Sequence, residues 1–127
     1  MALNEKKLDE LARINMGLGP VRTTQGGAAY TSNTNDAPNE GDGVDCAGAA
    51  WAEIIVRPVG GDVTFDILGR GGDSTFDVID QGGGLTSVQD RNYRQMVNVK
   101  DVVDELYVRL TGGSATGALV IISPCNG

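Results

Sequence analysis

The sequence predicts an all-β protein, a small antiparallel β-sandwich or barrel, preceded by a short N-terminal helix and a long extended arm. From residue 49 onward, apolar and polar residues alternate with a period of two, which is typical of strands with one buried face. Glycine-rich turns separate these segments at a spacing of about eleven residues, as in sandwiches and small barrels. The 127 residues fit one domain with a single modest core.

Residues 3–15 predict the N-terminal helix. Asn4 can cap it, Leu8 and Leu11 recur near helical spacing among charged residues, and Pro20 lies beyond its end. A helix of about three turns is marginal in isolation, so it needs a surface to pack on. That surface is either the chain's own domain or a neighbouring subunit, and the sequence leaves both open.

Residues 19–48 predict an extended arm, because Val21, Tyr30 and Val44 are the only sizeable apolar anchors in thirty residues. Such a segment is either a disordered linker or an arm ordered by a partner. Its acidic residues lack the spacing of a calcium-binding loop, which favours a solvated acidic loop; they are Asp36, Glu40, Asp42 and Asp45.

We therefore divide the chain into a helix and arm, residues 1–48, and a β-domain, residues 49–127. Because the period-two pattern begins only at residue 49, we expect a chain without residues 1–45 to keep a folded β-domain.

Six strands are expected in the β-domain, and each has a set of apolar residues for the core. These sets are Ala50, Ala52, Ile54 and Val56; Val63, Phe65 and Ile67; Phe76 and Val78; Val97 and Val99; Leu106, Val108 and Leu110; and the apolar residues of 118–123. The motif GGDVTFDIL at 60–68 returns as GGDSTFDVI at 71–79. This repeat predicts a hairpin around residues 69–72, in which Phe65 faces Phe76 on the core side.

Two of the strands carry a second row of apolar residues, on the face where an antiparallel sheet exposed to solvent on one side is expected to be polar. Trp51 and Ile55 lie opposite the core residues of the first strand, and Leu119 and Ile121 do so in the last. The N-terminal helix, the arm or another subunit must cover them. The residues predicted to form an interface are Leu8, Leu11, Trp51, Ile55, Leu119 and Ile121.

Composition excludes several classes of function. The formal net charge of −7 argues against nucleic-acid binding, because phosphates would be repelled. There is no apolar run of membrane-spanning length, and the charged N-terminus argues against a signal peptide. The sequence contains no histidine and no common nucleophile or phosphate-binding motif, so we expect no enzymatic activity, metal or cofactor. Cys46 and Cys125 are expected to be reduced thiols, with a disulfide left open.

The order of a short amphipathic segment, a polar arm and a small acidic β-domain ending in ELYVRLTGGSATGALVIISPCNG resembles tailed-bacteriophage virion proteins. Within that group the chain is most similar to capsid decoration, or cement, proteins. The resemblance implies a non-enzymatic structural protein of the virion that is made in the host cytoplasm, forms a homotrimer and binds the major capsid protein on the outer capsid surface. Neither nucleic acid nor membrane is an expected partner.

Two other interpretations remain open at this point. One is a receptor- or glycan-binding β-module of a phage fibre or baseplate, for which the candidate sugar platforms are Tyr30, Trp51, Tyr93 and Tyr107. The other is a secreted, disulfide-closed domain resembling lectins, which the charged N-terminus disfavours.

Overall fold

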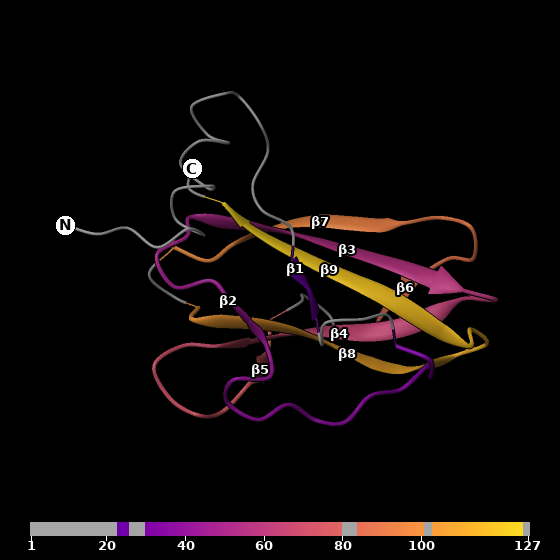
Figure 1. Cartoon of the computed structure of the whole chain (residues 1–127), viewed down its shortest axis with the longest axis horizontal. Helices are drawn as coiled ribbons and strands as arrows, with labels where there is room; N and C mark the ends of the chain where they lie inside the picture. Colours follow the sequence, from indigo (N-terminus) through magenta and orange to yellow (C-terminus); the bar gives the residue numbers. More distant parts are fainter. Residues whose placement is uncertain (1–22, 26–29, 80–83, 101–102, 126–127) are drawn as a thin grey trace.

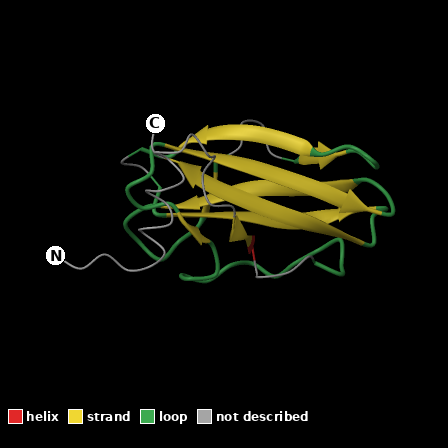
Figure 2. Cartoon of the chain, turned by 45° about the horizontal axis from the view of Figure 1, so that its top comes forward, coloured by secondary structure: helices red, strands yellow, loops and turns green. Residues whose placement is uncertain are grey.

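In the computed structural model, two antiparallel β-sheets pack face to face (Figures 1 and 2). Sheet 1 has the order β1 (Thr23–Thr24), β9 (Gly117–Cys125), β3 (Trp51–Val59) and β7 (Tyr93–Asn98). Sheet 2 has the order β2 (Val44–Asp45), β8 (Glu105–Gly113), β4 (Val63–Arg70) and β5 (Asp77–Val78), and β6 (Leu85–Ser87) also pairs with β4. The predicted all-β sandwich is confirmed.

The structure describes residues 23–25, 30–79, 84–100 and 103–125. The predicted helix at 3–15 lies outside these ranges. Within them, no helix is long and apolar enough to cross a membrane.

Each sheet is built on one long pair of strands that are distant in sequence. In sheet 1, β3 pairs with β9 from Trp51 opposite Cys125 to Val59 opposite Gly117. In sheet 2, β4 pairs with β8 up to Arg70 opposite Glu105, with a register shift between residues 64 and 65. These pairs place the apolar sets of four strands on the two inner faces.

The core lies between the sheets and contains most of the residues that the alternation selected. It also contains five residues that the alternation did not select, Val44, Cys46, Ala49, Val103 and Ala115. Its largest contributions are Ala52, Ile54 and Val56 of β3, Val63, Phe65 and Ile67 of β4, Leu106, Val108 and Leu110 of β8, and Ala118, Val120 and Ile122 of β9. The Phe65 ring meets the Tyr93 ring edge to face at 5.0 Å, which links β4 to β7 across the core. The predicted inward faces of these strands are confirmed.

The repeat segments do pair antiparallel, as β4 and β5, but the register predicted for their hairpin is wrong. Leu68 faces Val78, whereas the predicted register would have placed Asp73 there. Phe76 contacts Tyr107 at a ring distance of 6.2 Å. Tyr107 lies between two core residues of β8 and so points to the outer face of sheet 2. Phe65 and Phe76 are therefore on different faces.

The physical reason is a longer connection held by polar contacts. Arg70 Nη1 donates to the carbonyl of Asp73 at 2.8 Å, and the N–H of Gly72 donates to Asp104 at 3.0 Å. Gly72 in this connection has a φ of +84°, a backbone conformation that favours glycine. As a result β5 is a short, exposed strand.

The described part of the predicted arm is extended and lies along the sandwich. β1 pairs with β9, and β2 pairs with β8. Between them, Tyr30 bridges to Ala118 and Thr34 bridges to Thr111. Removal of residues 1–45 would take these contacts away, so we no longer expect that truncation to leave the β-domain intact.

Candidate functional site

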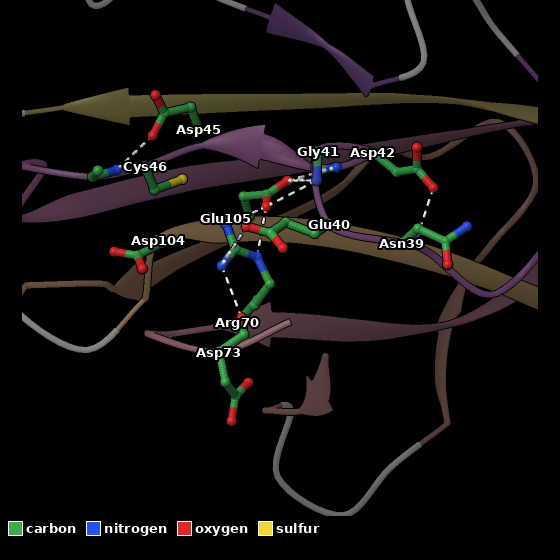
Figure 3. A network of polar contacts seen from close by, with 12 residues as sticks. Asn39, Glu40, Gly41, Asp42, Asp45, Cys46, Arg70, Asp73, Asp104 and Glu105 are labelled. Atoms are coloured by element: carbon green, nitrogen blue, oxygen red, sulfur yellow. Dashed lines mark hydrogen bonds and ion pairs between the residues drawn. The ribbon is translucent and has the colours of Figure 1, made fainter. Parts of the chain in front are cut away.

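A buried ion pair joins Arg70, the last residue of β4, to Glu105, the first residue of β8 (Figure 3). The two side chains are 13% and 7% exposed. Arg70 Nε donates to Glu105 Oε2 at 2.6 Å, and Nη2 contacts the same oxygen. This hydrogen bond raises the pKa of Arg70. Charges so far from water need further partners, because their desolvation is costly.

The backbone of the neighbouring segment supplies those partners. The N–H of Gly41 lies 3.1 Å from both oxygens of Glu105, and the N–H of Gly43 lies 3.1 Å from Oε1. A Cβ at Gly43 would come within 2.7 Å of the carbonyl oxygen of Leu106, so only glycine permits this approach. Asp42 closes the turn by accepting the N–H of Asn39 at 2.8 Å. The Glu105 carboxylate thus fastens residues 39–43 to the end of sheet 2.

A second set of polar side chains covers the open side of β8. Gln25 is completely buried; its Oε1 accepts the N–H of Val108 at 2.6 Å and its Nε2 donates to the Val108 carbonyl at 2.9 Å. Asn35 Oδ1 accepts the N–H of Leu110 at 2.6 Å, and its Nδ2 donates to the Val108 carbonyl at 3.1 Å. Two side-chain amides therefore occupy the positions that a neighbouring strand would otherwise fill.

The predicted interface residues have different environments. Leu8 and Leu11 lie outside the described ranges. Trp51 is 40% exposed, whereas Ile55 is 1% exposed although it points away from the core. Leu119 and Ile121 are half-buried on the same outer face of sheet 1. Ile55 is therefore covered within the single chain, and its place in an interface stays a prediction.

The outer face of sheet 1, formed by β3, β7 and β9, combines apolar and basic residues. Exposed Met96 of β7 lies opposite Glu53 of β3. Arg94 makes a loose ion pair with Glu53 at 3.9 Å, and Arg57 Nε donates to Asn92 at 3.1 Å. Acidic side chains gather instead along segment 36–45 and on β5 and the loops of sheet 2, at Asp36, Glu40, Asp42, Asp45, Asp73, Asp77 and Asp104.

The described cysteines do not form a disulfide. Cys46 is buried, Cys125 is half-buried, and both are free thiols. This finding removes the basis for a disulfide-closed domain. In the described ranges, no group of three or more His, Cys, Asp and Glu side chains is placed to hold a metal ion.

We predict that the two thiols react very differently. Burial, followed by the charge of Asp45, raises the pKa of Cys46 to about 12. At pH 8, iodoacetamide should therefore modify Cys125 and spare Cys46 until denaturant is added, because the thiolate is the reactive form. Peptide mass spectrometry reads the two sites separately. Equal labelling rates in the native protein would contradict the burial of Cys46.

We also predict an acid-sensitive contact at Asp66. The N–H of Gly84 and then Arg109 hold the pKa of Asp66 below its ordinary value. The stabilisation that the ionised Asp66 carboxylate gives the fold should be complete above about pH 5. It should disappear as the pH falls through the lowered pKa. The difference in thermal midpoint between the wild type and Asp66→Asn should therefore shrink from pH 7 to pH 2. A constant difference would contradict this prediction.

The aromatic residues proposed as sugar platforms are mostly used in packing. Tyr93 contacts Phe65, and Tyr107 is buried with its hydroxyl donating to the carbonyl of Asp36 at 3.2 Å. The Tyr30 hydroxyl accepts a hydrogen bond from Gln25 at 2.9 Å. Burial, followed by Tyr30, raises the pKa of Tyr107. Of the four candidates, Trp51 alone is a large exposed aromatic surface.

Comparison with known proteins finds no matching family model, no matching curated protein and no matching solved structure.

Proposed function

We propose that the chain is a non-enzymatic structural protein of a virion, a capsid decoration or cement protein that forms homotrimers and binds the major capsid protein on the outer capsid surface. The observation that carries the proposal is the unequal distribution of charge and apolar surface between the two sides of the sandwich. One side carries exposed Trp51 and Met96 with Arg57 and Arg94, and the other carries most of the exposed carboxylates.

This distribution suits a protein that lies flat on a larger surface. An exposed apolar patch with basic neighbours favours contact with another protein, particularly with an acidic one. The carboxylates on the far side would face solvent, where their mutual repulsion discourages stacking of further copies. Many weak contacts of this kind, repeated over a shell, give strong retention through multivalency.

The use of the polar groups also supports a structural role. Glu105 and Arg70 are paired with each other, Asp66 is paired with Arg109, and the Gln25 amide bonds to β8. The two ion pairs join β4 to β8, and the Gln25 amide holds the extended segment to the sandwich. A protein that reinforces a shell benefits from such rigidity, because a pre-ordered surface loses less conformational entropy on binding.

The proposed binding face can be tested with shells that lack the protein. We expect Trp51→Asp to reduce cosedimentation with such shells at least tenfold, because docking would bury an unpaired carboxylate. Val78→Asp is the matched control, since Val78 is similarly exposed but belongs to sheet 2. If wild-type protein does not bind the shells, or if both variants bind like wild type, the proposal is wrong.

The proposed trimer depends on the half-buried residues of β9. Leu119→Asp and Ile121→Asp should each convert the trimer into a monomer, while Leu119→Ala should weaken it less. Light scattering gives the mass of each species, and circular dichroism checks that the variant is folded. A wild-type protein that is monomeric at tens of micromolar would count against the trimer.

A further inference from the structure

Strand β7 forms one border of sheet 1 (Figure 1). Half of its N–H and C=O groups point away from β3, as its register and hydrogen bonds show. The N–H of Val99 donates to the carbonyl of the directly opposed Ala50 at 3.0 Å. In an antiparallel pair such hydrogen-bonded positions alternate. The odd-numbered residues 93, 95 and 97 therefore bond to β3. The N–H and C=O groups of Arg94, Met96 and Asn98 point outward, and no described strand pairs with them.

The other long edges of the sandwich are covered. The free side of β9 bonds to β1 and to Tyr30. The free side of β8 bonds to β2, to the amides of Gln25 and Asn35, and to Asn33, whose Nδ2 donates to the Gly113 carbonyl at 2.7 Å. On the outer side of β4, β5 and β6 have only two and three residues. In the described part of the chain, β7 is the longest strand with an open edge, and open edges are sites of strand pairing.

We infer that the open edge of β7 pairs antiparallel with β7 of a second copy of this chain, so that sheet 1 continues across two molecules. This inference does not depend on the proposed function. Pairing about a twofold axis at Met96 places Arg94 opposite Asn98 of the second copy, so no like charges are opposed. Arg94 then exchanges two backbone hydrogen bonds with Asn98 of the second copy, and the two Met96 residues do the same with each other.

The composition of β7 makes this strand better suited than an acidic segment of the chain to pair with a second copy. The strand YRQMVN contains one arginine and no carboxylate, in a chain with a net charge of −7. It is therefore a place where two acidic molecules can approach each other with little repulsion. The half-exposed Met96 side chains of the two copies would meet on the outer face, beside Trp51 of each copy.

A disulfide trap tests the register directly. The Cα atoms of a hydrogen-bonded antiparallel pair lie about 5.5 Å apart, which a disulfide can span. In a Cys125→Ser background, Met96→Cys should form a covalent dimer under mild oxidation at least tenfold faster than Val59→Cys. Val59 is the matched control because it has the same 50% exposure and lies on the same face, at the far end of β3. Equal rates would overturn the inference.

Hydrogen exchange of the wild-type protein gives a second, independent readout. Raising the protein concentration should slow exchange of the amides of Arg94, Met96 and Asn98 at least tenfold, while those of Gln95 and Val97 stay protected throughout. Met96→Pro should abolish the effect, because it removes an outward N–H without removing a bond to β3. If the three amides exchange at the same rate at every concentration, the edge does not pair, and the shell-binding proposal, which depends on Trp51, is unaffected.

Discussion

Replacement of Arg70 by Met is expected to lower the free energy of unfolding several times more than replacement of Arg94 does, because it leaves the buried Glu105 carboxylate without its cation. Both side chains are largely removed from solvent, and Arg70 is the only cation that contacts Glu105 among the described residues. Chemical denaturation followed by circular dichroism measures the change. It is among the largest single-residue effects that the structure predicts.

Arg94→Met is the matched control for this experiment. The Arg94–Glu53 pair is more exposed and longer, so its removal should cost no more than about 1 kcal/mol. The double variant Arg70→Met/Glu105→Leu should recover only part of the loss, because the N–H groups of Gly41 and Gly43 then lack their acceptor. If Arg70→Met costs no more than Arg94→Met, the buried network does not stabilise the fold.

Removal of the side-chain amides that cover β8 should have the second large effect. Gln25→Ala leaves the N–H of Val108 without its acceptor, and Asn35→Ala does the same to Leu110. Each is expected to cost about 1–3 kcal/mol, which is the penalty for an unsatisfied buried polar group. The double variant should also aggregate on warming, because it exposes the edge of β8.

Asn33→Ala is the appropriate comparison, since its bond to the Gly113 carbonyl is exposed and water can replace it. Thermal unfolding and static light scattering distinguish loss of stability from aggregation. A double variant that unfolds at the wild-type temperature, with no increase in light scattering, would contradict the role of the two amides in covering the edge of β8.

The main strands could be predicted from the sequence because burial on one face leaves a period-two signal. β3, β4, β8 and β9 have long alternating patterns, and the core contains the residues that those patterns select. The third predicted strand is present as the short β5, but its predicted register against β4 is wrong, because the turn and not the repeat determines the register. Contacts of Arg70 and Asp104 with loop 70–76 determine that turn, and alternation does not reveal them.

The polar sites were not predictable for a related reason. Glu105 occupies a position that looks solvent-facing, and its burial results from the return of residues 39–43 over the end of sheet 2. Gln25 bonds to a backbone 83 residues away, so no local pattern reports it. The alternation predicted that Trp51 and Ile55 point away from the core, but it did not predict that Ile55 is buried there.

The proposal that this chain decorates a capsid is tested most directly by counting its copies in purified virus particles. Quantitative mass spectrometry with labelled reference peptides gives the ratio of this chain to the major capsid protein. A decoration protein bound over the whole shell is expected in a fixed ratio, with a copy number of the same order as that of the capsid protein. Its absence from the virion, or a handful of copies per particle as in a fibre or baseplate, would contradict the account.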